Sequence, residues 1–134
     1  MALSLEIVTP EQRVLTTECD EVRLPGVDGG FGIRPGHTPL VATLAPGELA
    51  YDAAGSTHRY AAGEGFAEIS DDRVRVLVEE VLRADQIDAQ RAARELAETR
   101  KKLETIGPGD PDYDRVRAAV ERATARALVA GHRR

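Results

Sequence analysis

The spacing of apolar residues changes near Glu79, and this change limits the folds available to the chain. Before it, apolar and polar residues alternate in short runs, as at Val74, Val76 and Val78, which is the pattern of half-buried strands. Gly, Pro and Asp clusters predict turns between these runs at residues 9–11, 25–29, 45–47, 52–56, 63–65 and 70–72. Many short strands at such spacing predict an antiparallel β-sandwich. The sequence therefore predicts an α+β protein in two parts, a β-sandwich over residues 1–84 and an antiparallel two-helix hairpin over residues 85–134.

The first predicted helix follows the strands and runs over residues 86–104. Asp85 can cap its N-terminus, with Asp88 at the third helical position in an arrangement like a capping box. One face of this helix carries an apolar stripe that is mostly alanine: Ala89, Ala92, Ala93, Leu96 and Leu103. Arg100 also falls on the stripe, so we expect its guanidinium to extend along it to solvent.

A break rich in Gly and Pro, at residues 106–111, separates the first predicted helix from a second one. Asp110 is the expected N-cap and Pro111 the expected first helical residue, and the helix should continue to about Ala130. Its apolar stripe is again mostly alanine: Val116, Ala119, Val120, Ala123, Ala127 and Ala130. Because alanine buries little area, and burial contributes about 25 cal/mol per Å², we expect the hairpin to open easily.

Composition and charge exclude several classes of function. The 134-residue chain has a formal net charge of −5, so we expect no nucleic-acid partner, because phosphate recognition needs a basic surface. Cys19 is the single cysteine, which excludes an intramolecular disulfide and a multi-cysteine metal site. No apolar stretch approaches the ~20 residues of a membrane helix, and the first residues lack a signal-peptide pattern. Any membrane association is therefore expected to go through a partner.

The sequence lacks recognisable catalytic and metal-binding motifs. It has no Gly-x-Ser-x-Gly elbow, no P-loop and no His-x-x-x-His ligand pair. His37, His58 and His132 are widely separated, and no nucleophile lies beside a base in the sequence. We therefore predict a protein that is not an enzyme, with no catalytic residue and no metal site. An enzyme whose site is assembled from distant residues is the least favoured alternative.

A segment rich in Gly and Pro, residues 28–40, has a backbone that is shaped rather than periodic. Glycine tolerates positive φ, whereas proline fixes φ and lacks an N–H donor. Pro35 and Gly36 suit the central positions of a type II turn, which would direct His37 and Thr38 outward from the end of a sheet. The same segment leaves three apolar residues available for the core: Phe31, Ile33 and Leu40. On the residues alone, His37 is best explained as a solvated turn histidine.

Two motifs in this order resemble the epsilon subunit of F-type ATP synthases of the bacterial type. Residues 29–40 have the form Gly-x-Phe-Gly-Ile-x-Pro-Gly-His-x-Pro-Leu, and residues 87–92 fit the pattern Ile/Leu-Asp-x-x-Arg-Ala. The similarity covers essentially the whole chain. It implies a subunit of the central rotor stalk that binds the gamma subunit and the c-subunit ring, peripheral to the cytoplasmic face of the bacterial cell membrane. Catalysis would then belong to the alpha and beta subunits.

The same resemblance implies a mechanical role and a regulatory role. The subunit would couple proton transport through the c ring to ATP synthesis, and its C-terminal helices would inhibit ATP hydrolysis. A contact between the sandwich and the polar loops of the c ring is implied at Gly30 and His37. Some relatives carry an acidic residue where this chain has Gly30, so one charged contact is missing here.

An ATP site in the helical hairpin is a further implication of the resemblance. The residues that match it are Asp88, Arg91, Ala92, Arg122 and Arg126. Arginine suits this role because its planar guanidinium can donate two hydrogen bonds to phosphate oxygens. Relatives that bind ATP well can have an acidic residue before the motif and another arginine later in the first helix, where this chain has Leu82 and Glu98. We therefore expect no required cofactor and only weak binding of a regulatory ATP.

The arginines of the second predicted helix have two explanations. In the family, an extended helix enters the catalytic head, and the matching contact residues here are Arg115, Arg117, Arg122 and Arg126. On the residues alone, they form a solvated basic face that complements the helix dipole. The alternative function is a stand-alone ATP-sensing module whose hairpin closes on nucleotide.

Overall fold

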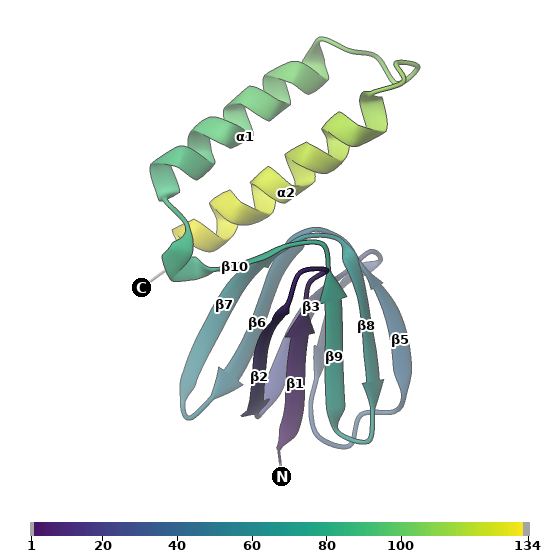
Figure 1. Cartoon of the computed structure of the whole chain (residues 1–134), viewed down its shortest axis with the longest axis vertical. Helices are drawn as coiled ribbons and strands as arrows, with labels where there is room; N and C mark the ends of the chain where they lie inside the picture. Colours follow the sequence, from purple (N-terminus) through teal and green to yellow (C-terminus); the bar gives the residue numbers. More distant parts are fainter. Residues whose placement is uncertain (1, 133–134) are drawn as a thin grey trace.

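The computed structural model describes residues 2–132 and shows a β-sandwich followed by two helices, as predicted (Figure 1). Residues 1 and 133–134, which the predicted domains include, lie outside the described residues. Within the described part, the strands are β1 (Leu3–Val8), β2 (Arg13–Cys19), β3 (Glu21–Gly26), β4 (Gly29–Ile33), β5 (Leu40–Leu44), β6 (Gly47–Ala53), β7 (Ser56–Ala62), β8 (Gly65–Ser70), β9 (Arg73–Val78) and β10 (Val81–Arg83). A short 3-10 turn, η1 (Ala84–Gln86), leads to the helices α1 (Ala89–Glu104) and α2 (Tyr113–Gly131).

The strands form one continuous sheet that curls around a shared core. Hydrogen-bonded neighbours follow the order β10-β7-β6-β3-β5-β8-β9-β1-β2, with β4 paired to β3. Among the described strands, every pair is antiparallel except β1 and β9, which run parallel with Leu5 opposite Val74. The last strand in this order, β2, contacts β6, so the sheet folds back on itself and encloses an interior.

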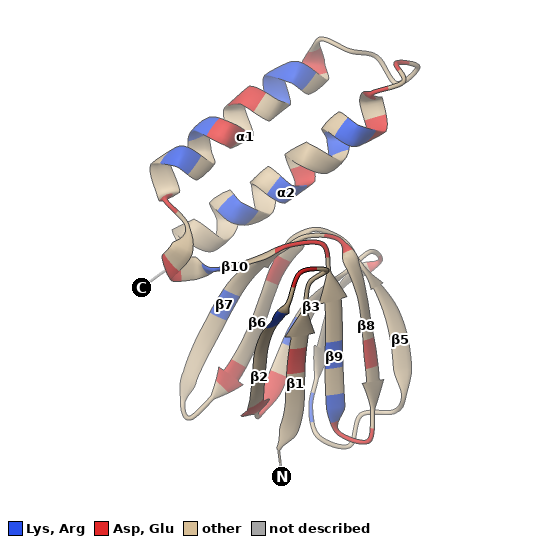
Figure 2. Ribbon diagram, in the orientation of Figure 1, with Lys and Arg blue, Asp and Glu red and all other residues tan. Residues whose placement is uncertain are grey.

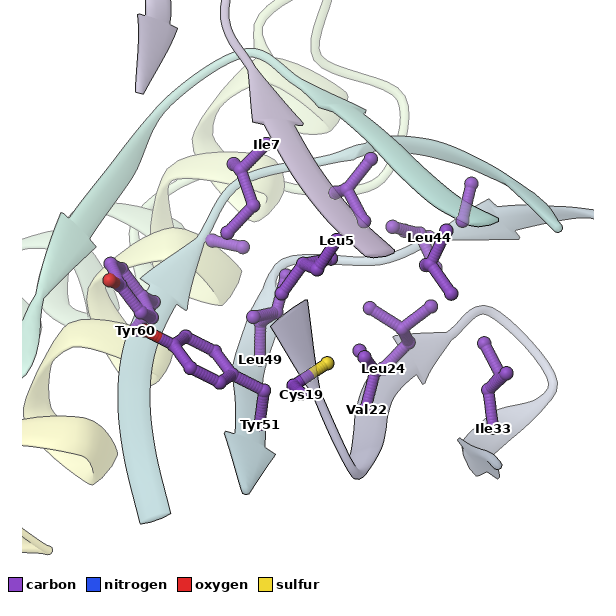
Figure 3. Packing of buried hydrophobic residues seen from close by; sticks show 14 of the residues in the cluster. Leu5, Ile7, Cys19, Val22, Leu24, Ile33, Leu44, Leu49, Tyr51 and Tyr60 are labelled. Atoms are coloured by element: carbon purple, nitrogen blue, oxygen red, sulfur yellow. The ribbon is translucent and has the colours of Figure 1, made fainter. Parts of the chain in front are cut away.

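Side chains that alternate along the strands fill this interior (Figure 3). On β1, Leu3, Leu5 and Ile7 are buried, whereas Ser4 between them is exposed. Leu49 of β6 is buried in the same cluster. Burying each such side chain stabilises the fold by about 1.5–3 kcal/mol. The alternating apolar residues of the strands therefore form the core.

Cys19, the last residue of β2, belongs to this core and forms no disulfide. Burial, together with the nearby carboxylates of Asp20 and Asp52, raises the pKa of its thiol to about 11. Because the thiolate is the reactive form, Cys19 should react poorly with alkylating reagents at neutral pH.

The first helix begins later than predicted, and its N-cap is Asp88 rather than Asp85. The Asp88 carboxylate accepts a hydrogen bond from the backbone N–H of Arg91 at 3.0 Å. Ile87 explains the difference, because it is buried in the cluster between hairpin and sheet and its backbone is extended. Asp85 instead pairs with Arg83 at 2.6 Å. Burial of one apolar side chain has therefore decided where this helix starts.

The second helix also begins later than predicted. Asp112, not Asp110, is its N-cap residue, and Pro111 lies in the preceding turn. The Asp110 carboxylate accepts the N–H of Asp112 at 2.8 Å, and its carbonyl accepts the N–H of Tyr113 at 3.0 Å. Asp110 therefore stabilises the turn before the helix. The end of α2, at Gly131, is close to the predicted one.

The buried faces of the helices differ from the predicted alanine stripes because α2 packs on two partners. It contacts α1 on one side and strands β6 and β7 on the other. On α1, Ala92 is buried as predicted, but Ala89 and Ala93 are exposed. On α2, the buried residues include Ala125 and Val129, which the predicted stripe omitted. A prediction from periodicity that assumes one packing partner for α2 omits the residues that face the second partner.

Candidate functional site

The loop after β4 contains the turn predicted for Pro35 and Gly36. Gly36 has a φ of 87°, and the N–H of His37 donates to the carbonyl of Arg34 at 3.2 Å. A type II turn requires such a positive φ at its third position, which glycine adopts without strain. Asp72, in the turn between β8 and β9, accepts the N–H of Gly36 at 2.7 Å. This bond ties the loop to the end of the sandwich opposite the helices (Figure 1).

The two residues expected to contact a c ring lie toward opposite ends of β4. Gly30 is near the start of the strand, whereas His37 lies in the loop that follows it. The Nδ1 atom of His37 is 2.6 Å from the carbonyl of Thr38, and the residue is half-buried. His37 thus contacts the backbone of its neighbour while it stays partly exposed to solvent, which is compatible with the expected turn histidine.

The apolar residues of the same segment divide between core and surface. Ile33 is fully buried and Phe31 packs partly against the core, as predicted. Leu40 is 39% exposed, so its predicted place in the core is wrong. It is the first residue of β5, and of this strand only Leu44, the last residue, is buried.

A pocket of about 400 Å³ lies where α1 begins, beside α2. Its lining contains four of the five residues predicted for an ATP site: Asp88, Arg91, Ala92 and Arg126. Arg122, the fifth, does not line it, because its guanidinium pairs with Glu64 at 3.0 Å. The rest of the lining is formed by Leu82, Gln86, Ile87 and Glu95. The structure therefore brings most of the predicted residues together and adds a second carboxylate, Glu95.

The charged groups of this pocket already have partners within the chain. The Asp88 carboxylate caps α1 by accepting the N–H of Arg91, and this hydrogen bond lowers the pKa of the Asp88 carboxyl. The guanidinium of Arg91 lies 3.0 Å from Glu95. Arg126 lies 2.6 Å from Glu80 and 3.8 Å from Glu95. Arg126 and Glu80 are 46 residues apart, so no local pattern in the sequence could have revealed this pair.

The four arginines of α2 form two groups. Arg115 and Arg117 are exposed, and Arg115 lies 3.6 Å from Asp112 at the surface. Arg122 and Arg126 are half-buried and face the sandwich, where their carboxylate partners lie. The hairpin therefore leaves half of the predicted contact arginines available to a partner in this conformation.

An apolar row on the outside of the sandwich is a second candidate surface. The strand register places Phe66 opposite Leu77, and Leu77 opposite Val8. These three residues help to line a mostly apolar pocket of about 350 Å³. Phe66 is 46% exposed, and Val41 on neighbouring β5 is 71% exposed. Contiguous apolar surface of this kind marks protein contact sites. Nothing in the sequence distinguishes this row, because alternation looks the same on covered and uncovered faces.

The surface features described above are suited to binding other proteins. The tethered loop, the apolar outer row and the exposed arginines of α2 are features typical of a protein that docks on other proteins. Within residues 2–132, no cluster of three or more His, Cys, Asp or Glu side chains could hold a metal. The helices in that part of the chain are too short or too polar to cross a membrane.

Known proteins of similar sequence are chains of ATP synthase. A family model described as "ATP synthase, Delta/Epsilon chain, beta-sandwich domain" matches residues 2–84. The chain is 45% identical over 131 residues to the ATP synthase epsilon chain of Anaeromyxobacter sp. (strain K), covering 98% of this chain and 99% of the relative. It is 41% identical over 129 residues to that of Geobacter sulfurreducens, covering 96% and 94%. The chain belongs to the ATP synthase epsilon-chain family, as its two motifs predicted.

Solved structures of ATP synthases contain the same fold. A chain in the Euglena gracilis mitochondrial enzyme has a TM-score of 0.83 at 24% identity, covering 98% of this chain and 82% of that chain. A chain in the central stalk and c ring of the Tetrahymena thermophila mitochondrial enzyme has a TM-score of 0.56 at 11% identity, covering 98% and 96%. Membership of the family makes this chain a non-catalytic subunit, which confirms that prediction.

Proposed function

We propose that this chain is part of the central rotor stalk of a bacterial ATP synthase and couples proton transport through the c ring to ATP synthesis. The observation that carries the proposal is its similarity to ATP synthase epsilon chains over 98% of its length. In this role it is peripheral to the cytoplasmic face of the cell membrane and is held there by its partners. The native chain should co-purify with the gamma subunit and the c ring. Isolation as a lone monomer would contradict the stalk role and favour the stand-alone sensor.

The gamma subunit is proposed to bind the apolar row on the outer face of the sandwich. The exposure of Phe66 and the adjoining apolar pocket support this choice. Phe66→Glu should reduce co-purification with gamma by tenfold or more, because a buried, unpaired carboxylate disfavours an apolar interface. Leu128→Glu is the matched control, since Leu128 has a similar exposure of 47% but lies on α2. An equal loss in both variants would argue against this face.

The c ring is proposed to contact the end of the sandwich that carries His37, with Gly30 farther along β4. The bond between Gly36 and Asp72 supports this role, because it fixes the loop to the sandwich and would let the loop transmit force. In the assembled enzyme, His37→Cys should cross-link to cysteines placed in the polar loops of the ring. Ala97→Cys, at an exposed position on α1, is the control. Cross-linking from position 97 but not from 37 would reverse the assigned orientation.

Inhibition of ATP hydrolysis is proposed to depend on release of the hairpin. The docked hairpin covers Arg122 and Arg126, and an extended α2 would present them with Arg115 and Arg117 to acidic segments of the alpha and beta subunits. The two forms are populations whose ratio a ligand changes only through differential affinity. Removing residues beyond Ala84 should raise hydrolysis by the assembled enzyme. Unchanged hydrolysis would restrict this subunit to coupling.

Weak binding of ATP at the pocket beside α1 is a second proposal. It is supported by the convergence of Asp88, Arg91, Ala92 and Arg126 on one cavity. An incoming phosphate must displace Glu80 and Glu95 from Arg126, which is the physical reason to expect low affinity. Calorimetry should detect binding at millimolar ATP in the unsubstituted chain and in Arg117→Ala, and lose it in Arg126→Ala. No heat of binding to the unsubstituted chain would end the proposal.

A further inference from the structure

An alternating series of charges crosses the junction between the hairpin and the sandwich. We call it the charge ladder, and its members in order are Arg91, Glu95, Arg126, Glu80, Arg122 and Glu64. Successive nitrogen-to-oxygen distances along it are 3.0, 3.8, 2.6, 3.9 and 3.0 Å. Two members, Arg91 and Glu95, belong to α1. The two arginines that follow, Arg126 and Arg122, belong to α2, and Glu80 and Glu64 lie in turns of the sandwich. The ladder therefore links all three parts.

The two central arginines of the ladder lie at the junction, whereas the side chain of Glu80 between them is 42% exposed. The side chains of Arg122 and Arg126 are 26% and 21% exposed, whereas Arg115 on the same helix is 72% exposed. Figure 2 shows acidic segments at the end of the sandwich that faces α2, and basic segments along α2. Partial burial reduces screening by water, so these pairs contribute more than pairs at a fully exposed surface.

Apolar contact at the same junction is small. The buried cluster there is mostly alanine and consists of Ala61, Ala84, Ile87, Ala92, Ala125, Val129 and Ala130. Alanine removes little area from water, so the apolar contribution is lower than in a leucine-rich interface. Charge therefore has more weight in docking this hairpin than it has within the sandwich core.

We propose that the charge ladder is an electrostatic latch that keeps the hairpin docked on the sandwich without a bound ligand. Glu80 is the decisive member, because it approaches both Arg122 and Arg126. Loss of its charge weakens both contacts, whereas added salt weakens every contact of the ladder together. The latch is a property of the isolated chain. Its effect on hydrolysis rests on the proposed function.

Docking can be measured as a distance between two spin labels on the full-length chain. Ser56→Cys at the start of β7 and Thr124→Cys on α2 place the labels at exposed positions on the two parts. Cys19 should remain unlabelled, because it is buried and its thiol pKa is raised to about 11. Release of the hairpin then appears as a second, longer distance.

Glu80→Gln and Glu79→Gln form the matched pair of variants. Both remove one negative charge from the connection between β9 and β10, but Glu79 is exposed and forms no ion pair with any residue in the range 2–132. We expect Glu80→Gln to raise the ratio of released to docked chains roughly three- to tenfold at low salt. Glu79→Gln should behave as the unsubstituted chain does. Raising salt from about 0.1 M to about 1 M, which shortens the Debye length from about 10 Å to about 3 Å, should release the unsubstituted chain as well.

Two results overturn the latch. An unchanged distance distribution in Glu80→Gln and at high salt would show that the apolar cluster is sufficient. Equal shifts in Glu80→Gln and Glu79→Gln would show a general effect of net charge. Far-UV circular dichroism checks that the strands persist, and Glu64→Gln, which removes the terminal carboxylate, is a second variant with a smaller expected shift. These measurements need no partner subunit, so they are decided separately from the hydrolysis assay.

Discussion

The sandwich and the hairpin are stabilised by different kinds of contact. In the sandwich, branched side chains such as Leu5, Leu49 and Val76 are completely buried and come from strands far apart in the sequence. In the cluster between the hairpin and the sheet, most buried residues are alanine, and charged pairs surround them. Val129 is the one large side chain of α2 that is fully buried within the described residues.

This difference predicts a gradient of stability along the chain. Local opening requires less free energy where few apolar atoms are buried. In the proposed role, the sandwich transmits torque and needs a core that resists deformation, whereas the hairpin changes conformation and needs contacts that can be broken. The division of large and small apolar residues between the two parts supplies both properties in one short chain.

Leu49→Ala should cause the largest loss, and it acts on the sandwich. Leu49 is fully buried, so its truncation leaves a cavity and lowers the free energy of unfolding by about 2–5 kcal/mol. Urea unfolding followed by far-UV circular dichroism measures this change. Val41→Ala is the control, because Val41 is 71% exposed and its loss should cost about 0.5 kcal/mol or less. Equal losses would mean that burial does not distinguish the two sites.

Val129→Ala should release the hairpin and spare the sandwich. The lost apolar contact, about 1.5–3 kcal/mol, falls on the junction between the two parts. Hydrogen exchange should therefore become faster by tenfold or more in α1 and α2, with little change in the strands. Leu128→Ala, at a neighbouring residue that is 47% exposed, should leave exchange nearly unchanged. Faster exchange in every strand would mean that the two parts unfold as one unit.

Asp88→Ala should loosen the first turn of α1, a smaller and more local effect. The Asp88 carboxylate accepts the N–H of Arg91, and removing it leaves that donor without its cap. Amides at the start of α1 should exchange several-fold faster. Asp85→Ala, at the residue that the sequence had suggested as the cap, should not alter them. The reverse ranking would restore the original assignment.

Acid should weaken the sandwich slightly through Asp52, the smallest expected effect. Bonds from Arg23 at 2.9 and 3.0 Å, and from Thr57, lower the pKa of Asp52 from 3.8 to about 2. Since the pKa is lower in the folded state, this carboxylate stabilises the fold above about pH 4, and that contribution disappears as the pH falls toward about 2. Asp52→Asn should flatten this part of the pH dependence in urea unfolding. Glu68→Gln, at an exposed position on β8, should retain it.

The range of each interaction decides how much of this structure could be predicted. Strand alternation and the turn at Pro35 and Gly36 are local, and both were predicted correctly. The start of α1 was not, because it depends on burial of Ile87 against residues of the sheet and α2.

The candidate pocket shows the same division. Its motif residues were predicted by resemblance to a family, and four of the five line one cavity. Arg122 does not line the pocket in this conformation and pairs instead with Glu64, which lies 58 residues away in the sequence. The apolar periodicity of α2 does not show how many elements pack on it, so the burial of Val129 was not predicted.

The parallel pairing of β1 with β9 has a consequence for biosynthesis. Leu5 lies opposite Val74, so β1 must wait for β9, which is synthesised about 65 residues later, before this pairing can form. Until residues 73–78 emerge, β1 lacks β9, one of its two neighbouring strands. Nascent chains that end before residue 73 should expose apolar core residues and depend on chaperones. Translation of β9 is therefore the step that gives β1 its second neighbouring strand.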